Sequence, residues 1–194
     1  MRTSELTRAF VLLLALAVSR PALAEDAYPS AAKAYQAGVA AIEARKFDDA
    51  FKALEFAASQ DHFHAKFVLA QLYSSDALPY ADHAKAFHLF AEIADRYSTI
   101  DPYLDKRSPY VARALVAVAE YEMKGLPEIE LAADPEKALK DLDYASKYFD
   151  DMDAQLALVK IWLKDKDDPG NFRQARDLLL RLAREKGHPG AQAT

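Results

Sequence analysis

Apolar residues recur at intervals of three and four positions along most of this 194-residue chain. In an α-helix, residues at that spacing fall on one face, so the pattern is typical of amphipathic helices that bury one side against a neighbour. The sequence has no long stretches that alternate apolar and polar residues, as half-buried strands do, and it contains only five glycines. The pattern therefore predicts an all-α protein.

Helix starts are indicated by short polar side chains, which accept hydrogen bonds from the free amides of a first turn, and by prolines, which lack an amide hydrogen. The predicted starts are Ser30, Asp61, Ser108 before Pro109, Asp134 before Pro135, and Asn171 with Gln174. Short breaks are expected at residues 45–47, 59–61, 76–80, 150–152 and 165–170. Helices separated by breaks this short predict a series of helical hairpins.

A repeated spacing of small residues relates these hairpins to one another. The second helix of each pair has an alanine near its start and another small residue eight positions later, on nearly the same face. The pairs are Ala50 and Ala58, Ala86 and Ala94, Ala138 and Ser146, and Ala175 and Ala183, and their first members lie 36, 52 and 37 residues apart. We expect four stacked units, with an ordinary helical bundle as the alternative.

The 52-residue interval holds about 16 residues more than the interval before it. We place the excess at about residues 97–110, as an interruption between one unit and the next. Aromatic residues at helical spacing are expected to fill the seams between helices rather than to form a ligand site. They are Phe56, Phe67, Tyr73, Phe87, Phe90, Tyr121, Tyr148, Trp162 and Phe172.

The first 24 residues have the order of a secretory signal peptide. Arg2 and Arg8 precede an apolar run over residues 9–18, and residues 22–24 supply small side chains around a cleavable bond between Ala24 and Glu25. The apolar run is about half as long as the roughly 20 residues that a membrane-spanning helix needs. We therefore expect residues 25–194 to form one α-repeat domain that is exported to the periplasm, with no direct insertion into the membrane.

Charge and cysteine content narrow the function. The full chain has a net charge of −5, and removal of three arginines and Glu5 with the signal peptide makes it −7. That balance disfavours nucleic acid and anionic membrane as partners. The absence of cysteine excludes disulfides, thiol catalysis and cysteine metal sites.

No arrangement typical of an enzyme is found. Nucleophile elbows, phosphate loops and HExxH are missing from the sequence. His62 and His64 are close enough to suggest a metal, but a recurrent role in a turn is favoured. The acidic run at residues 150–153 is interpreted as helix capping, and that at residues 165–168 as a solvated turn. We expect no catalytic activity, no cofactor and no metal.

The units resemble Sel1-like repeats, which are related to tetratricopeptide repeats. Asp49-Ala50, Ala57-Ala58 and Ala65 are the clearest copy of the repeat pattern, and Leu69-Ala70-Gln71-Leu72-Tyr73 follows. Over roughly residues 35–192 the chain is also similar to the periplasmic exopolysaccharide regulators of rhizobia, including the interruption in the same unit. Residues 74–76 and 164–166 depart from the pattern, because repeat loops usually have glycine there.

The resemblance implies a right-handed α-solenoid of stacked helical hairpins. It also implies a periplasmic protein that binds the periplasmic sensor domain of a membrane histidine kinase and restrains signalling to exopolysaccharide and envelope genes. The alternative is a structural adaptor or chaperone for cell-envelope protein assembly. Nothing in the sequence separates these two binding roles.

Two regions are predicted to bind a protein. The first helices of the stack are expected to line a concave surface, with polar positions at Lys66, Gln71, Arg113, Glu120, Gln155 and Lys160. The interruption adds Tyr103, Lys106 and Arg107, and tyrosine and arginine are common interface anchors. The alternative for the interruption is a plain spacer that packs Tyr103 and Leu104 against the stack.

Export of the chain is expected to remove residues 1–24. N-terminal sequencing of the protein recovered from periplasm should then begin at Glu25. Recovery of a chain that still begins at Met1 would contradict the predicted cleavage.

Overall fold

A computed structural model describes residues 28–164 and 168–185 of the chain. The predicted signal peptide, the cleavage positions Ala24 and Glu25, and residues 165–167 and 186–194 lie outside the described residues. The helices are α1 (Ala31–Glu43), α2 (Phe47–Ser59), α3 (Phe63–Tyr73), α4 (His83–Tyr97), α5 (Ser108–Lys124), α6 (Pro135–Tyr148), α7 (Met152–Lys164) and α8 (Pro169–Glu185), with a 3₁₀ turn η1 (Pro127–Ile129). Within these ranges, β structure is limited to one bridge between Leu126 and Leu131. The predicted all-α class is confirmed.

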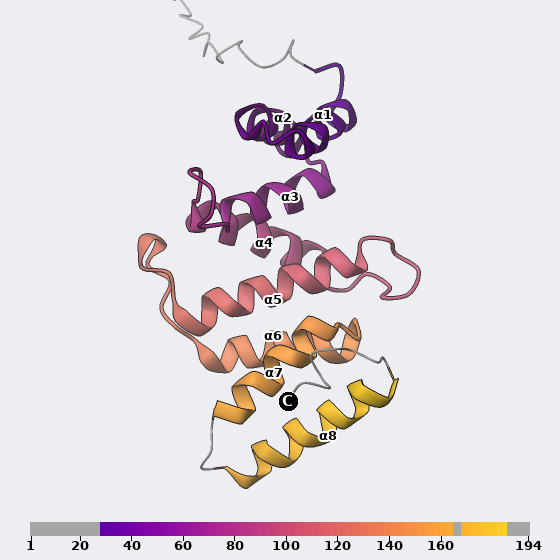
Figure 1. The fold of residues 1–194 in the computed structure, drawn as a ribbon, viewed down its shortest axis with the longest axis vertical. Coiled ribbons are helices and arrows are strands. Elements are labelled where there is room, and N and C mark those ends of the chain that lie inside the picture. The colour runs from indigo at the N-terminus through magenta and orange to yellow at the C-terminus, as the bar shows by residue number, and fades with distance from the viewer. Residues whose placement is uncertain (1–27, 165–167, 186–194) are drawn as a thin grey trace, which may run out of the picture.

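The helices stack in chain order, from α1 and α2 at one end to α8 at the other (Figure 1). Each helix packs against the next, and the first helices of the last two hairpins, α5 and α7, also contact each other. One cluster of buried residues runs through α1 to α7, and a second one joins α7 to α8. This elongated core is that of a helical-repeat solenoid, as predicted, and differs from the single central core of a bundle.

The small residues of the second helices lie where neighbouring helices meet. Ala50, Ala86, Ala138 and Ala175 are each fully buried, one in each hairpin. Eight positions further on, Ala94 and Ser146 are buried, and Ala58 and Ala183 are half-buried. A side chain of one carbon lets helix backbones approach closely, so the predicted register of small residues is confirmed as a packing feature.

Predicted helix starts are confirmed where a side chain caps the first turn. Ser30 Oγ accepts from the Lys33 amide at 3.2 Å, and Asp134 Oδ1 accepts from the Lys137 amide at 2.9 Å. The same arrangement at Asp82, which accepts from the Lys85 amide at 3.0 Å, was not predicted.

Three predicted starts are wrong in detail. Asp61 has a φ of 61°, and His62 caps α3 instead, through Nδ1, which accepts from the Ala65 amide at 3.2 Å. Ser108 is the first residue of α5, and its hydroxyl donates to backbone carbonyls rather than accepting from an amide. Asn171 lies inside α8, which begins at Pro169.

Most of the predicted aromatic residues fill the seams. Phe67, Tyr73 and Phe90 are buried, and Tyr148 is half-buried. Partly buried against the main cluster are Phe56, Phe87, Tyr121 and Trp162. Phe172 is 60% exposed, so its prediction is wrong. The contact of α8 with α7 is formed instead by Ala175, Leu178 and Leu182.

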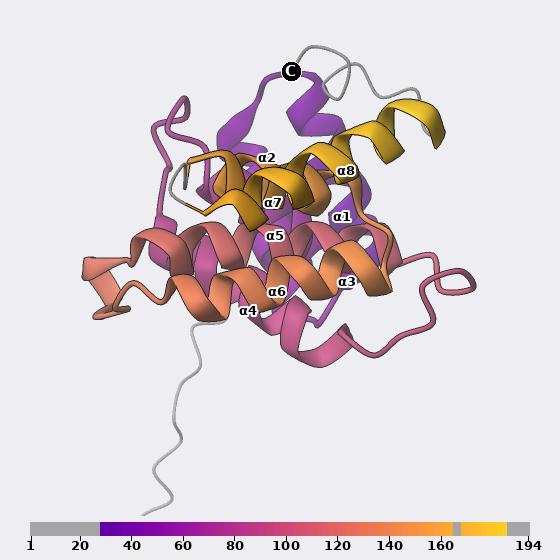
Figure 2. The same ribbon diagram turned by 90° about the horizontal axis from the view of Figure 1, so that it is seen from below.

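The connection from α4 to α5, residues 98–107, is ten residues long and is called the connector below. The equivalent connections between the other hairpins, residues 60–62 and 149–151, have three residues each. Much of the remaining extra length of this unit lies in α5, which has 17 residues where α3 has 11. The connector and the loop after α5 project from opposite sides of the stack (Figures 1 and 2).

None of the helices in the described ranges combines the length and the apolar character that crossing a membrane requires.

Replacement of Ala50 by leucine is expected to lower the free energy of unfolding by about 1–3 kcal/mol, because the added carbons have no room in a filled seam. The matched control is Lys52→Leu on the same helix, where the side chain is exposed and a change within about 0.5 kcal/mol is expected. Urea unfolding followed by circular dichroism measures both. Equal stability of the two variants would contradict the packing role of Ala50.

Candidate protein-binding surface

Four of the predicted surface residues lie exposed on successive first helices. Gln71 is on α3, Arg113 and Glu120 are on α5, and Lys160 is on α7. Because α3, α5 and α7 follow one another along the stack, these side chains are distributed over three hairpins. The array offers polar groups of both charges to a partner that spans several units.

Lys66, predicted as a surface position, is engaged within the protein. Its ammonium group pairs with Asp61 and with Glu92, both at 2.5 Å, and its side chain is only 12% exposed. Arg96 reaches the same Asp61 carboxylate at 2.8 Å. Hydrogen bonds from Lys66 and Arg96 lower the pKa of Asp61. These contacts tie the turn before α3 to α4, so Lys66 serves the stack.

The prediction that Gln155 lies on the binding surface is also wrong, because this side chain is buried in α7. Its amide nitrogen donates to Asp150 Oδ1 at 2.9 Å and to the Ser146 carbonyl at 3.3 Å. The side chain therefore closes the turn between α6 and α7. A partner cannot reach it without opening that turn.

The connector is an ordered loop held by its own polar groups. The carboxylate of Asp101 accepts from the amides of Tyr103 and Leu104, both at 2.8 Å. The Ser108 hydroxyl donates to the carbonyls of Asp101 at 2.9 Å and Asp105 at 2.7 Å. These bonds replace the helix or sheet partners that loop backbone groups lack.

Arg107 fastens the end of the connector to the stack. Its guanidinium group grips the Asp105 carboxylate, with Nη2 at 2.7 Å from Oδ2 and Nε at 3.0 Å from Oδ1. It also lies over the rings of Tyr97 and Phe63, 4.6 Å and 5.8 Å from their centroids. The hydrogen bonds from Arg107 lower the pKa of Asp105 to about 2.

Two tyrosines of α6 fasten the other end. The Tyr144 hydroxyl donates to the Ser98 carbonyl at 2.8 Å, and the Tyr148 hydroxyl donates to the Ile100 carbonyl at 3.2 Å. Their rings stack on each other with centroids 5.1 Å apart. The connector is thus attached to the hairpins on both of its sides.

The tip of the connector faces solvent. Tyr103 is 86% exposed and Leu104 is 83% exposed, and Lys106 beside them is exposed as well. The alternative in which the interruption packs Tyr103 and Leu104 against the stack is wrong. Leu104 was not among the predicted binding residues, although its place between Tyr103 and the charged run of residues 105–107 was a signal for it.

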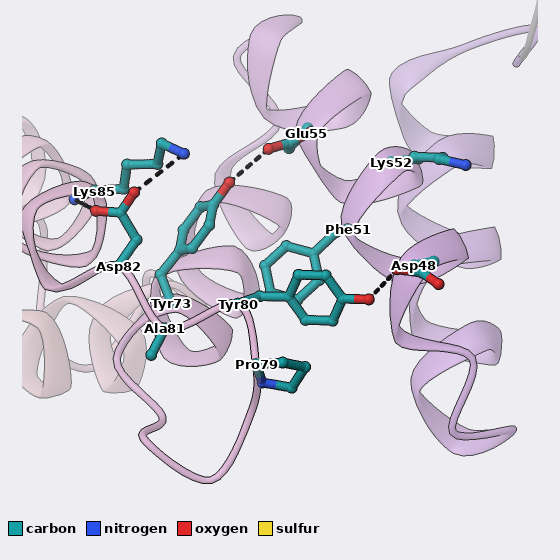
Figure 3. Close-up of a pocket in the computed structure, with 10 residues that line it drawn as sticks. All are labelled: Asp48, Phe51, Lys52, Glu55, Tyr73, Pro79, Tyr80, Ala81, Asp82 and Lys85. Atoms are coloured by element: carbon teal, nitrogen blue, oxygen red, sulfur yellow. Dashed lines mark hydrogen bonds and ion pairs between the residues drawn. The ribbon is translucent and has the colours of Figure 1, made fainter.

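A shallow groove of about 400 Å³, which sequence reasoning missed, lies between α2 and the loop that joins α3 to α4 (Figure 3). Phe51, Tyr73 and Tyr80 form its apolar part. The Tyr73 hydroxyl donates to Glu55 at 2.5 Å, and the Tyr80 hydroxyl donates to Asp48. Burial and the bond to Glu55 raise the pKa of Tyr73. The groove is therefore a seam between two units, and the tyrosine hydroxyls of one unit are hydrogen-bonded to the carboxylates of the other.

The remaining titratable residues of interest have structural roles. Asp151 Oδ1 accepts from the Ala154 amide at 2.9 Å, which confirms helix capping within the acidic run, and burial raises the pKa of Asp151. Glu122 is buried beside the Lys137 ammonium group with which it pairs, and burial raises the pKa of Glu122. Among the described residues, no three histidine, aspartate or glutamate side chains are grouped so that they could hold a metal ion.

The chain is similar in sequence to two proteins that share one name. The chain is 29% identical over 157 residues to a protein of Rhizobium meliloti (strain 1021) named exopolysaccharide production negative regulator, across 81% of this chain and 57% of that protein. It is 26% identical over 188 residues to a protein of the same name from Rhizobium leguminosarum bv. viciae, across 94% of this chain and 69% of that protein. This chain therefore spans a little over half to about two thirds of the length of these relatives. No family model matches it.

The Asp105 carboxylate is expected to stay ionised down to about pH 2, against an ordinary pKa near 3.8. A lowered pKa means that the ion pair stabilises the connector above about pH 4, and that this contribution is lost as the pH falls toward 2. Carboxyl carbon shifts in NMR spectra measure the titration. Arg107→Ala should return the pKa toward 3.8, whereas the control Lys106→Ala should leave it low. An unchanged pKa in Arg107→Ala would contradict the assigned pairing.

Proposed function

We propose that this chain is a non-enzymatic periplasmic regulator that binds the periplasmic sensor domain of a membrane histidine kinase and thereby lowers exopolysaccharide production. The main support is similarity to two proteins named as negative regulators of that process, over 81% and 94% of the chain. The signal-peptide pattern of residues 1–24 supports the compartment.

The form of the molecule suits binding. A helical-repeat stack presents a long surface on elements that are rigid relative to one another, so it can hold a folded domain at several separated points. The exposed side chains of Gln71, Arg113, Glu120 and Lys160 lie on such a surface, on α3, α5 and α7. The altered pKa values of Asp61, Asp105 and Glu122 belong to ion pairs, and that of Asp151 belongs to a helix cap. Such roles favour recognition over catalysis.

Restraint of a kinase needs no chemistry by the regulator. A protein that binds the inactive conformation of a sensor domain tenfold more tightly than the active one shifts the equilibrium between them by about 1.4 kcal/mol in favour of the inactive form. Release of the regulator then restores signalling. The energy required is modest for an interface that extends over two or three hairpins.

Deletion of the gene in its own host is expected to raise exopolysaccharide, and expression of the full chain should restore the lower amount. A pull-down from solubilised inner membrane should recover one histidine kinase. The combined variant Gln71→Ala, Arg113→Ala, Lys160→Ala should weaken that recovery, because it removes contacts on three first helices. The matched control is Lys140→Ala with Lys147→Ala, two exposed lysines on the second helix α6.

Recovery of many envelope proteins without a kinase, together with unchanged exopolysaccharide, would contradict the proposal and favour an assembly adaptor. Equal loss of the kinase with the α6 control would show that the first helices are not the binding face.

A further inference from the structure

We infer that Tyr103 and Leu104 form the apolar anchor by which the chain docks on its protein partner, and that the partner offers an apolar pocket bordered by an acidic side chain. This inference rests on the proposed function, since the partner is taken to be the periplasmic sensor domain of the histidine kinase. It assigns the anchor to two adjacent residues at the tip of the connector.

The exposure of these two side chains is unusual for the molecule. Four large hydrophobic residues are exposed in the described ranges, and Tyr103 and Leu104 are far more exposed than Phe172 and Leu180. They are also adjacent, and they stand on a segment that projects from the stack (Figures 1 and 2). Apolar groups gathered on a projecting loop are typical of contact sites, where tyrosine above all supplies binding energy.

Chain connectivity does not explain the loop. Three residues suffice to join α2 to α3 and α6 to α7, whereas residues 98–107 join α4 to α5. Ile100 packs against the main cluster near the start of the connector, whereas Tyr103 and Leu104 at its tip are exposed to solvent and fill no gap between hairpins.

The loop is held so that the anchor is ready to bind. The Asp101 carboxylate fixes the amides of Tyr103 and Leu104, and Tyr144 and Tyr148 hold the carbonyls of residues 98 and 100. Binding by a loop that is already ordered loses less conformational entropy than binding by a flexible one. The bracing therefore increases the affinity that two exposed side chains can provide.

Charge indicates the chemistry of the pocket. At the tip, Asp101 and Asp105 are occupied by hydrogen bonds and an ion pair within the loop. Lys106 is exposed, and no ion pair joins it to another side chain of the described residues. Asp101 accepts only from neutral amides and keeps its negative charge before the anchor, while the positive charge of Lys106 follows the anchor. Lys106 therefore favours an acidic neighbour on its own side of the apolar pocket. Arg107 is bound to Asp105, so we assign it a positioning role rather than direct contact.

The test measures the affinity of the chain purified from periplasm for the purified periplasmic domain of the host's sensor kinase by isothermal titration calorimetry. Tyr103→Ser with Leu104→Ser should raise the dissociation constant by about thirtyfold or more, as loss of a hot spot does. The matched control, Phe172→Ser with Leu180→Ser, removes the other two exposed apolar residues and should bind like the unaltered chain. Circular dichroism establishes that both variants are folded.

Arg107→Ala is expected to weaken binding in the unaltered chain and to add nothing in the Tyr103→Ser, Leu104→Ser background, because it acts through the tip. Additive losses would overturn the positioning role.

Unchanged affinity of the Tyr103→Ser, Leu104→Ser variant would overturn the anchor and leave the proposed function standing. A dimer of the unaltered chain in sedimentation velocity that disappears in this variant would instead assign the tip to self-association. If the unaltered chain binds no kinase domain, the proposed function fails together with the anchor.

Discussion

The architecture depends on the close approach of consecutive helices at positions where the side chain is a single carbon. Ala50, Ala86, Ala138 and Ala175 are fully buried, and each belongs to the second helix of a different hairpin. Larger buried side chains of the same helices, such as Leu54, Ile93 and Leu142, fill the rest of the seams. Because every hairpin obeys the same constraint, the stack extends in one direction and keeps a long surface open for binding.

The connector between α4 and α5 departs from this regularity, and side chains of the stack hold it in place. The connector is gripped by Tyr144 and Tyr148 from α6 on one side, and by Arg107 over Phe63 and Tyr97 on the other. These rings come from α3, α4 and α6, so three helices contribute to holding one loop. A rigid repeat scaffold that carries a braced projection can combine a broad contact with one local apolar anchor, which suits recognition of a folded domain.

Sequence reasoning reached the features that depend on local pattern. The register of small residues and the caps at Ser30 and Asp134 follow from spacing and from short-range hydrogen bonds. The prediction of an exposed surface position was wrong where the side chain contacts another segment of the protein. Lys66 forms ion pairs with Asp61 and Glu92, and Gln155 donates a hydrogen bond to Asp150 in the turn before α7. Sequence reasoning also misplaced Phe172, because periodicity identifies an apolar face of α8 but not which part of that face meets α7.

We propose that the first helices α3, α5 and α7 present the surface that engages a membrane sensor kinase, with the tip of the connector at the contact. The most direct measurement is photo-crosslinking in living cells, with a photoreactive phenylalanine analogue placed at position 103, and at position 172 as the control site. A crosslink to a histidine kinase is expected from position 103 and none from position 172. Crosslinks from position 103 only to other copies of the chain, or the same kinase adduct from both positions, would contradict it.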